Sequence, residues 1–173
     1  QDIIKHVDRL IKNQINHPKV AVLMDTLMDQ FELNPQSRIL VFCHFRDTVH
    51  FLEELMTRNP IIKAQRFIGQ QKKKNSKGLS QKEQLEILEK FKAGEFNTLI
   101  ATSVAEEGLD ISECDVVIFY DIVPSEIRSI QRRGRTGRNS KGKVILLKTK
   151  DTREEGYFWA EKHRERKMKT ILK

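Results

Sequence analysis

The chain has 173 residues, of which 38% are hydrophobic and 32% charged, as in a soluble globular domain long enough to bury a core. No apolar run approaches the ~18 residues of a membrane span and no signal peptide opens the chain, so we expect no membrane contact. The chain opens with Gln1 rather than Met, so we expect it to be a piece of a longer protein.

The net charge of +8 is unevenly distributed along the chain. Residues 126–173 hold sixteen Lys or Arg and six Asp or Glu, whereas residues 1–125 hold sixteen and eighteen. A basic C-terminal third predicts a polyanionic partner, either nucleic acid or nucleotide phosphates. Cys43 and Cys114 are two lone cysteines, so we expect reduced core residues and a cytoplasmic protein.

Helical and strand patterns alternate along the chain. In chain order we expect helices over 3–15 and 18–33, a strand over 38–43, a helix over 47–58, a strand over 63–68, a polar loop over 69–79, a helix over 80–94, strands over 97–102 and 115–120, a short helix from Pro124, a strand over 143–148 and a charged helix over 151–169. The helix over 80–94 has the clearest signals, because Ser80 and Glu83 form a capping box and Gly94 is a stop signal.

Apolar strands that alternate with helices predict a parallel sheet covered on both faces. We therefore expect an α/β fold, a three-layer sandwich with a mainly parallel sheet flanked by helices. Ligand-binding loops follow the carboxyl ends of the strands in such sheets. The stretch "ATSVAEEGLDI" (101–111) directly follows one predicted strand, and "QRRGRTGR" (131–138) lies at the end of one helix.

Four arginines in eight residues repel one another unless an anion approaches them, and basic stretches of this length are typical of nucleic-acid patches. A solvated basic turn is the alternative. The stretch "GRNSKGKV" (137–144) matches a P-loop except for Val144 at its last position, but it precedes a strand, so we expect a plain turn. The five histidines and two cysteines show no metal-ligand spacing, and we expect no metal site.

The two stretches resemble motifs V and VI of superfamily 2 helicases, and "RILVFCHFRDT" (38–48) resembles motif IV. The likeness runs from about Lys19 to Lys150 and is to the second of the two RecA-like domains of these enzymes. It is strongest to the branch of archaeal Hef and the Fanconi-anaemia-group-M translocases, which Gln131 supports over the DEAD-box RNA helicases.

The resemblance implies that Arg135 and Arg138 are arginine fingers on a γ-phosphate. A planar, always-charged guanidinium matches phosphate oxygens, and a spacing of three residues puts both on one face of a helical turn. It also implies ATP contacts by Gly108, Asp110, Gln131 and Arg132. A cap or turn role is the alternative for Asp110.

Nucleic-acid contacts are implied for a second set of residues, which hold the phosphate backbone without reading its sequence. This set contains His44, Arg46, Gly69, Gln70, Thr102 and Ser103. For the first four, an ordinary surface loop is the alternative. Tyr157, Phe158 and Trp159 stand in a row, so some of them are expected to dock on the body, with base stacking as the alternative.

The whole protein is then expected to be an ATP-dependent DNA helicase that acts on forked or branched DNA in repair. The Walker A lysine and the Mg²⁺-binding carboxylates are absent here, so ATP and Mg²⁺ would be held mainly by a first RecA-like domain, and this piece would be inactive alone. A nuclease domain could follow Lys173. Two alternatives stay open: an RNA-dependent ATPase of the RIG-I or Dicer type, and a nucleic-acid-binding module without ATPase activity.

Three segments are expected within the chain. Residues 1–17 would form a helical lead-in from a preceding domain, residues 18–150 the second RecA-like domain, and residues 151–173 a C-terminal basic helix.

Overall fold

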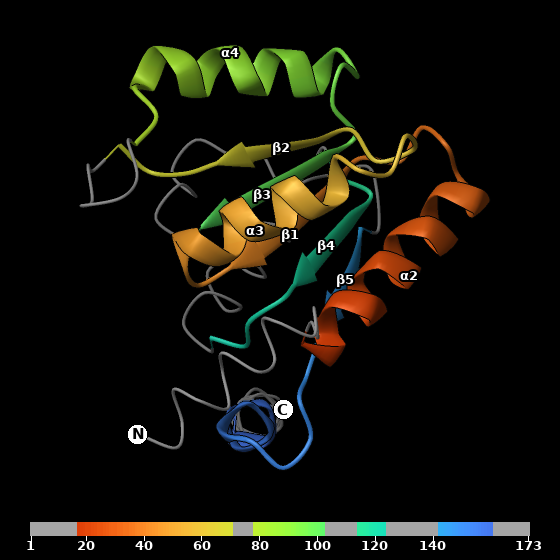
Figure 1. The fold of residues 1–173 in the computed structure, drawn as a ribbon, viewed down its shortest axis with the longest axis vertical. Helices are drawn as coiled ribbons and strands as arrows, with labels where there is room; N and C mark the ends of the chain where they lie inside the picture. Colours follow the sequence, from red (N-terminus) through yellow and green to blue (C-terminus); the bar gives the residue numbers. More distant parts are fainter. Residues whose placement is uncertain (1–16, 71–77, 103–113, 124–141, 161–173) are drawn as a thin grey trace, which may run out of the picture.

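The computed structural model describes residues 17–70, 78–102, 114–123 and 142–160 (Figure 1). The helices expected over 3–15 and from Pro124, and the end of the helix expected over 151–169, lie outside these residues. Among the described residues, no helix is both long and apolar enough to cross a bilayer.

Five strands form one sheet in the order β2-β3-β1-β4-β5, and every neighbouring pair is parallel. The carboxyl ends of the strands therefore meet at one edge of the sheet, and the predicted parallel α/β sheet is confirmed. The strands are β1 (Ile39–Cys43), β2 (Ala64–Phe67), β3 (Thr98–Thr102), β4 (Val116–Phe119) and β5 (Lys143–Leu146).

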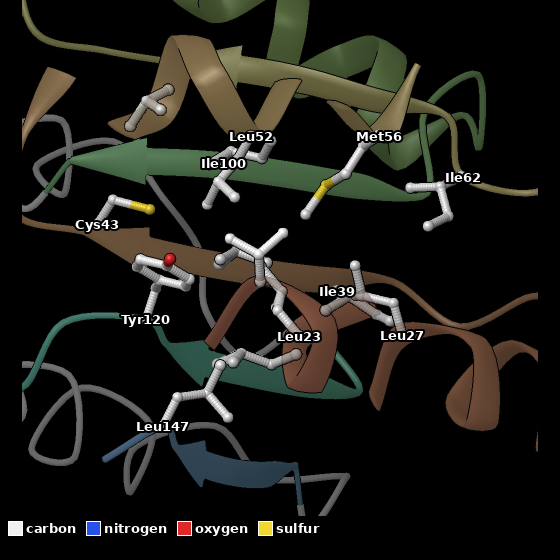
Figure 2. Packing of buried hydrophobic residues seen from close by; sticks show 14 of the residues in the cluster. Leu23, Leu27, Ile39, Cys43, Leu52, Met56, Ile62, Ile100, Tyr120 and Leu147 are labelled. Carbon is white, nitrogen blue, oxygen red and sulfur yellow. The ribbon is translucent and has the colours of Figure 1, made fainter. Parts of the chain in front are cut away.

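Two helices, α2 (Pro18–Leu33) and α3 (Arg46–Met56), cover one face of the sheet (Figures 1 and 2). Alternate residues of β1 point to this face, and Leu23, Leu27 and Leu52 of the two helices pack on them without any exposed surface. Burying a side chain of this size stabilises the fold by about 1.5–3 kcal/mol. This face therefore fixes where the first turns of α2 and α3 lie relative to the carboxyl edge.

The other face of the sheet buries the alternate set of strand residues. Phe42 of β1 stacks on Phe119 of β4 with ring centroids 5.5 Å apart, and Phe91 packs here from helix α4 (Gln81–Lys92). Helical residues 153–160 contribute Phe158 to the same cluster, whereas Tyr157 and Trp159 are exposed. The expected docking of part of this aromatic row is thus confirmed for Phe158.

The predicted elements agree with the structure to within one or two residues at each end. Helix α2 begins at Pro18, where the missing N–H of proline costs no hydrogen bond, and the His17 ring accepts from the Lys19 amide at 3.2 Å. Ser80 and Glu83 make the predicted capping box, and Gly94 adopts a φ of 81°, a conformation that favours glycine. Cys43 and Cys114 are both buried and form no disulfide, as predicted.

Candidate functional site

The carboxyl edge of the sheet gathers four loops whose residues were predicted to bind nucleic acid or lie next to such residues. His44 directly follows β1, Gly69 lies two residues after the end of β2, Thr102 ends β3, and Asp121 lies two residues after the end of β4. The parallel register places these strand ends side by side. The topology therefore assembles one surface from segments that are far apart in the sequence.

Arg46 joins two of these loops. It is the first residue of α3 and is only 9% exposed, and its Nη2 donates to the Gly69 carbonyl oxygen at 2.9 Å. A hydrogen bond from a charged group is stronger than a neutral one, so it ties the loop after β1 to the loop after β2. The structure thus places Arg46 and Gly69 inside this edge, and it leaves His44 and Gln70 exposed.

The chain returns to Gln70 at Gly78, and the two backbones touch. A Cβ atom built on Gly78 would lie 2.3 Å from the Gln70 carbonyl oxygen, closer than real Cβ atoms come to backbone. Only glycine fits there without a backbone shift. Gln84 of α4 also donates to the Ile68 carbonyl at 3.0 Å, so α4 helps to hold the segment that carries Gly69 and Gln70.

The loop after β1 is also held by the segment that follows β4. The His44 amide donates to Oδ2 of Asp121 at 2.8 Å. The ring of His44 meets the Phe45 ring edge-on, with 4.6 Å between centroids, and the Phe45 side chain is 63% exposed. This loop therefore presents two aromatic rings on a backbone that is fixed at several points.

Thr102 ends β3 and is only 3% exposed. Its Oγ1 finds no hydrogen-bond partner within the described part of the chain. An unpartnered buried hydroxyl costs about 1–3 kcal/mol, so this atom is suited to accept or donate a hydrogen bond when its surroundings rearrange. The neighbouring predicted contact, Ser103, lies outside the described residues.

A buried lysine, Lys19, connects the segment of Glu154 to the carboxyl edge of the sheet. Lys19 Nζ donates to the Tyr120 carbonyl oxygen at 2.8 Å and to Oε1 of Glu154, and it lies 5.5 Å from the centre of the Tyr120 ring. Burial would raise the pKa of Glu154, but the hydrogen bonds from Lys19 and the Thr149 amide outweigh it and lower that pKa. Burial, with the carboxylate of Asp121 nearby, raises the pKa of Tyr120 to about 12.

A hollow of about 700 Å³ opens beside this network, between the first turns of α2 and α3, the end of β4 and residues 149–154. Its charged lining mixes two cations, Lys19 and Arg153, with three carboxylates, Asp47, Asp121 and Glu154. An anion would meet more carboxylates than cations there. The hollow is therefore not a phosphate site, although it is close to the strand ends.

The residues that were predicted to contact ATP, and the two predicted arginine fingers, all lie outside the described residues. These residues are Gly108, Asp110, Gln131, Arg132, Arg135 and Arg138. Their roles stay predictions. Within the described ranges no three His, Cys, Asp or Glu side chains stand together in a way that could hold a metal ion.

Sequence reasoning missed Lys19, Phe45 and Asp121. Asp121 follows a buried strand, so the rule that placed Thr102 at a strand end could have found it. Phe45 lies inside the stretch that resembles motif IV, but nothing in the local pattern says that its ring faces outward. The pairing of Lys19 with Glu154 joins residues 135 positions apart, and no local signal predicts it.

Three comparisons with known proteins agree on one kind of domain. Residues 18–140 match the family described as the helicase conserved C-terminal domain. The chain is 47% identical to a Methanocaldococcus jannaschii protein, MJ1505, whose name assigns it to the ATP-dependent RNA helicases, over 96% of this chain and 21% of that protein. It is 38% identical to the ATP-dependent DNA helicase mph1 of Aspergillus niger, over 98% of this chain and 16% of that protein.

Among solved structures, the chain is similar to the Hef helicase domain of Pyrococcus furiosus. The identity is 44% and the TM-score 0.77, over 91% of this chain and 31% of that one. The chain therefore spans about a third of that helicase domain and about a fifth of the curated relatives it matches.

Proposed function

Because the chain belongs to the family of helicase conserved C-terminal domains, we propose that it is the second RecA-like lobe of an ATP-dependent DNA helicase or translocase that acts on forked or branched DNA. The observation that carries the proposal is the 44% identity to the Hef helicase domain, together with the same fold. The lobe supplies one wall of an ATP site and half of a DNA-binding track. A first RecA-like domain supplies the other wall, and a cytoplasmic location fits two cysteines that form no disulfide.

In the proposed ATP site, Arg135 and Arg138 reach the γ-phosphate of ATP that is bound mainly by the first domain. Charge develops on that phosphoryl group as it leaves, and two planar guanidiniums match its oxygens. Gly108, Asp110, Gln131 and Arg132 line the remainder of this wall. The proposal assigns Mg²⁺ to the first domain, which would carry the P-loop and the acidic residues that this chain lacks.

In the proposed DNA track, the strand runs over the carboxyl edge of the sheet. The exposed side chains of His44 and Gln70 face it, and Thr102 and Ser103 offer hydroxyls to the phosphate backbone. Arg46 acts differently, because its buried guanidinium is bound to the Gly69 carbonyl oxygen. It positions the Gly69–Gln70 segment against the loop of His44.

One observation favours a second candidate. The relative that is 47% identical is named as an RNA helicase, whereas mph1 is named as a DNA helicase. An RNA-dependent ATPase would use the same lobe and the same fingers. ATPase activity of the full-length protein with single-stranded DNA, duplex DNA, forked DNA and double-stranded RNA separates the two, since only the true substrate stimulates turnover. A nuclease domain after Lys173 stays part of the proposal only for the DNA enzyme.

The fingers are tested in the full-length protein. Changing Arg135 or Arg138 to Ala lowers kcat by roughly 10³–10⁵-fold, because each guanidinium stabilises charge that appears only in the transition state. ATP affinity falls much less, and DNA affinity changes little because many other basic residues remain. Steady-state ATPase kinetics and equilibrium DNA binding measure the three quantities.

Three controls sharpen this test. Arg133→Ala has a milder effect, Arg135→Lys does not restore turnover because a point charge cannot reproduce the fork, and the 173-residue chain alone hydrolyses no ATP. Near-normal turnover with weaker DNA binding and a shallower salt dependence in the Arg135 and Arg138 variants would make this stretch a DNA-backbone patch instead.

A further inference from the structure

Phe45 is unusual both as a helix-capping residue and as an aromatic residue. It is the N-cap residue of α3, a position that favours Ser, Thr, Asp or Asn, and it makes no side-chain capping hydrogen bond. Its ring is also 63% exposed, so it gains little from burial in the core. The ring therefore remains accessible for a contact outside the fold.

The backbone that carries this ring is held in place on both sides. The amide of His44, one residue before, is bound to Asp121, and the carbonyl oxygen of Phe45 accepts from the Val49 amide at 3.2 Å. Arg46, one residue after, is bound to the Gly69 carbonyl oxygen. The His44 ring lies edge-on against the Phe45 ring and leaves both exposed. The pair is therefore a preorganised aromatic platform, which loses little conformational freedom when a flat ligand binds.

The charges around this platform say which part of a nucleic acid fits it. Asp47 is exposed two residues along the chain, and Asp121 is held under His44. The nearby cation, Arg46, is buried and directed at Gly69. Neighbouring carboxylates repel a phosphate, whereas an uncharged nucleobase needs no cation and stacks on an aromatic face.

We propose that Phe45, flanked by His44, stacks on an unpaired base of single-stranded DNA at the carboxyl edge of the sheet. This proposal rests on the proposed function. It makes that function more specific, because it states that the DNA bound beside Phe45 is single-stranded. The phosphates of the same strand pass over the neighbouring loops, and the base turns toward the Phe45 ring. Duplex DNA, whose bases are already stacked and paired, does not use this contact.

Phe45→Ser in the full-length protein tests the proposal, because Ser is a favoured N-cap residue. The variant is expected to be at least as stable as the wild type in urea unfolding, and to bind oligothymidine about 5- to 150-fold more weakly. The wild type should bind an abasic oligonucleotide of the same length more weakly than it binds oligothymidine. On the abasic oligonucleotide, Phe45→Ser and the wild type should have the same affinity. The dependence of affinity on salt should stay unchanged, since no charge is removed.

Three matched variants separate stacking from other roles. Phe45→Trp should keep the preference for the base-bearing oligonucleotide, because Trp also offers an aromatic face. Phe45→Leu should lose it, because Leu is apolar but has no such face. Phe51→Ala, which removes another exposed ring from the same helix, should bind both oligonucleotides like the wild type.

The outcomes are distinguishable. If the Phe45→Ser variant keeps the preference for the base-bearing oligonucleotide, or if Phe45→Leu binds as tightly as the wild type, the stacking site is wrong while the helicase lobe stands. If Phe45→Ser is markedly less stable, the ring has a structural role and the inference falls. If the wild type binds neither oligonucleotide and DNA does not stimulate its ATPase, both the proposed function and this inference fall.

Discussion

At the scale of single residues, the ion pair of Lys19 and Glu154 joins two segments that are 135 positions apart in the sequence. Lys19 is almost fully buried, and Glu154 is the more exposed partner. Removing one partner of a buried pair leaves an uncompensated charge, which costs more than the pair is worth by itself. The pair holds residues 149–154 against α2, and through the Tyr120 carbonyl it lies one residue from the aspartate that anchors the His44 loop.

We expect Glu154→Gln to lower the free energy of unfolding by about 1–2 kcal/mol at neutral pH, because Lys19 then stays charged and buried without its carboxylate. The pKa of Glu154 is lower in the folded chain than its ordinary value of 4.5. Such a group stabilises the fold above that value and loses this contribution as the pH falls through its folded pKa. Urea unfolding should therefore show a difference between the two proteins that shrinks below pH 4.5.

The neighbouring pair of Lys148 and Glu155 is the control. Both side chains are more exposed than Lys19, with 2.8 Å between Nζ and Oε1, so Glu155→Gln should cost less than Glu154→Gln. A double variant, Lys19→Met with Glu154→Gln, should cost less than the sum of its parts because the two residues contact each other. Equal and additive losses would mean that the contact contributes nothing to stability.

At the scale of elements, helix α4 depends on its ends more than α2 or α3 does. Phe91 is its one buried residue, with Ile87 and Leu88 partly buried. The Ser80 amide donates to Glu83 at 2.7 Å, and the Glu83 amide donates to the Ser80 hydroxyl at 3.3 Å. A helix with little buried surface opens locally at low cost, so its caps decide how long it stays folded.

Ser80→Ala should destabilise α4 by about 0.5–2 kcal/mol through the loss of this cap. Amide hydrogen exchange should rise across Gln81–Lys92. The buried amides of β1 and β3 should exchange as before, because they open only when the whole domain unfolds. Ser80→Thr keeps a hydroxyl and should behave like the wild type. Uniform acceleration across the sheet would instead show that α4 opens only together with the domain.

At the scale of the whole molecule, we expect charge rather than shape to dominate the first encounter with the proposed DNA partner. The net charge of +8 is concentrated in residues 126–173, which hold sixteen basic and six acidic residues. When basic side chains neutralise DNA phosphates, counterions are released, and this contribution to the binding free energy does not depend on the DNA sequence.

The 173-residue chain alone should therefore bind DNA weakly, with a Kd of roughly 10⁻⁴–10⁻⁶ M at physiological salt, and without sequence preference. Fluorescence anisotropy over a range of salt concentrations should give a steep, linear loss of log affinity with log salt. Scrambling the oligonucleotide sequence should leave the affinity unchanged. Tight binding whose Kd does not change with salt concentration would contradict a phosphate-backbone contact.

The amino-acid sequence by itself determined the fold class and nearly every element within the described residues. Apolar runs such as Ile39–Cys43 predict strands buried on both faces, and the capping box at Ser80 predicts where α4 begins. These signals are local, because strand and helix periods and caps depend on residues only a few positions apart. The resemblance to helicase motifs also named the loops that meet at the carboxyl edge, although the roles of their residues stay predictions.

Only the tertiary structure decided which side chains of those loops face outward. The guanidinium of Arg46 is bound to Gly69, 23 residues away, whereas its neighbour Phe45 is exposed. The contact of Arg46 with nucleic acid stays a prediction. Asp121 reaches the His44 amide across 77 positions, and Glu154 reaches Lys19 across 135. These contacts follow from the strand order β2-β3-β1-β4-β5, which brings distant segments together. Local propensity contains no information on that order, because it is set by how whole helices and strands pack into one core.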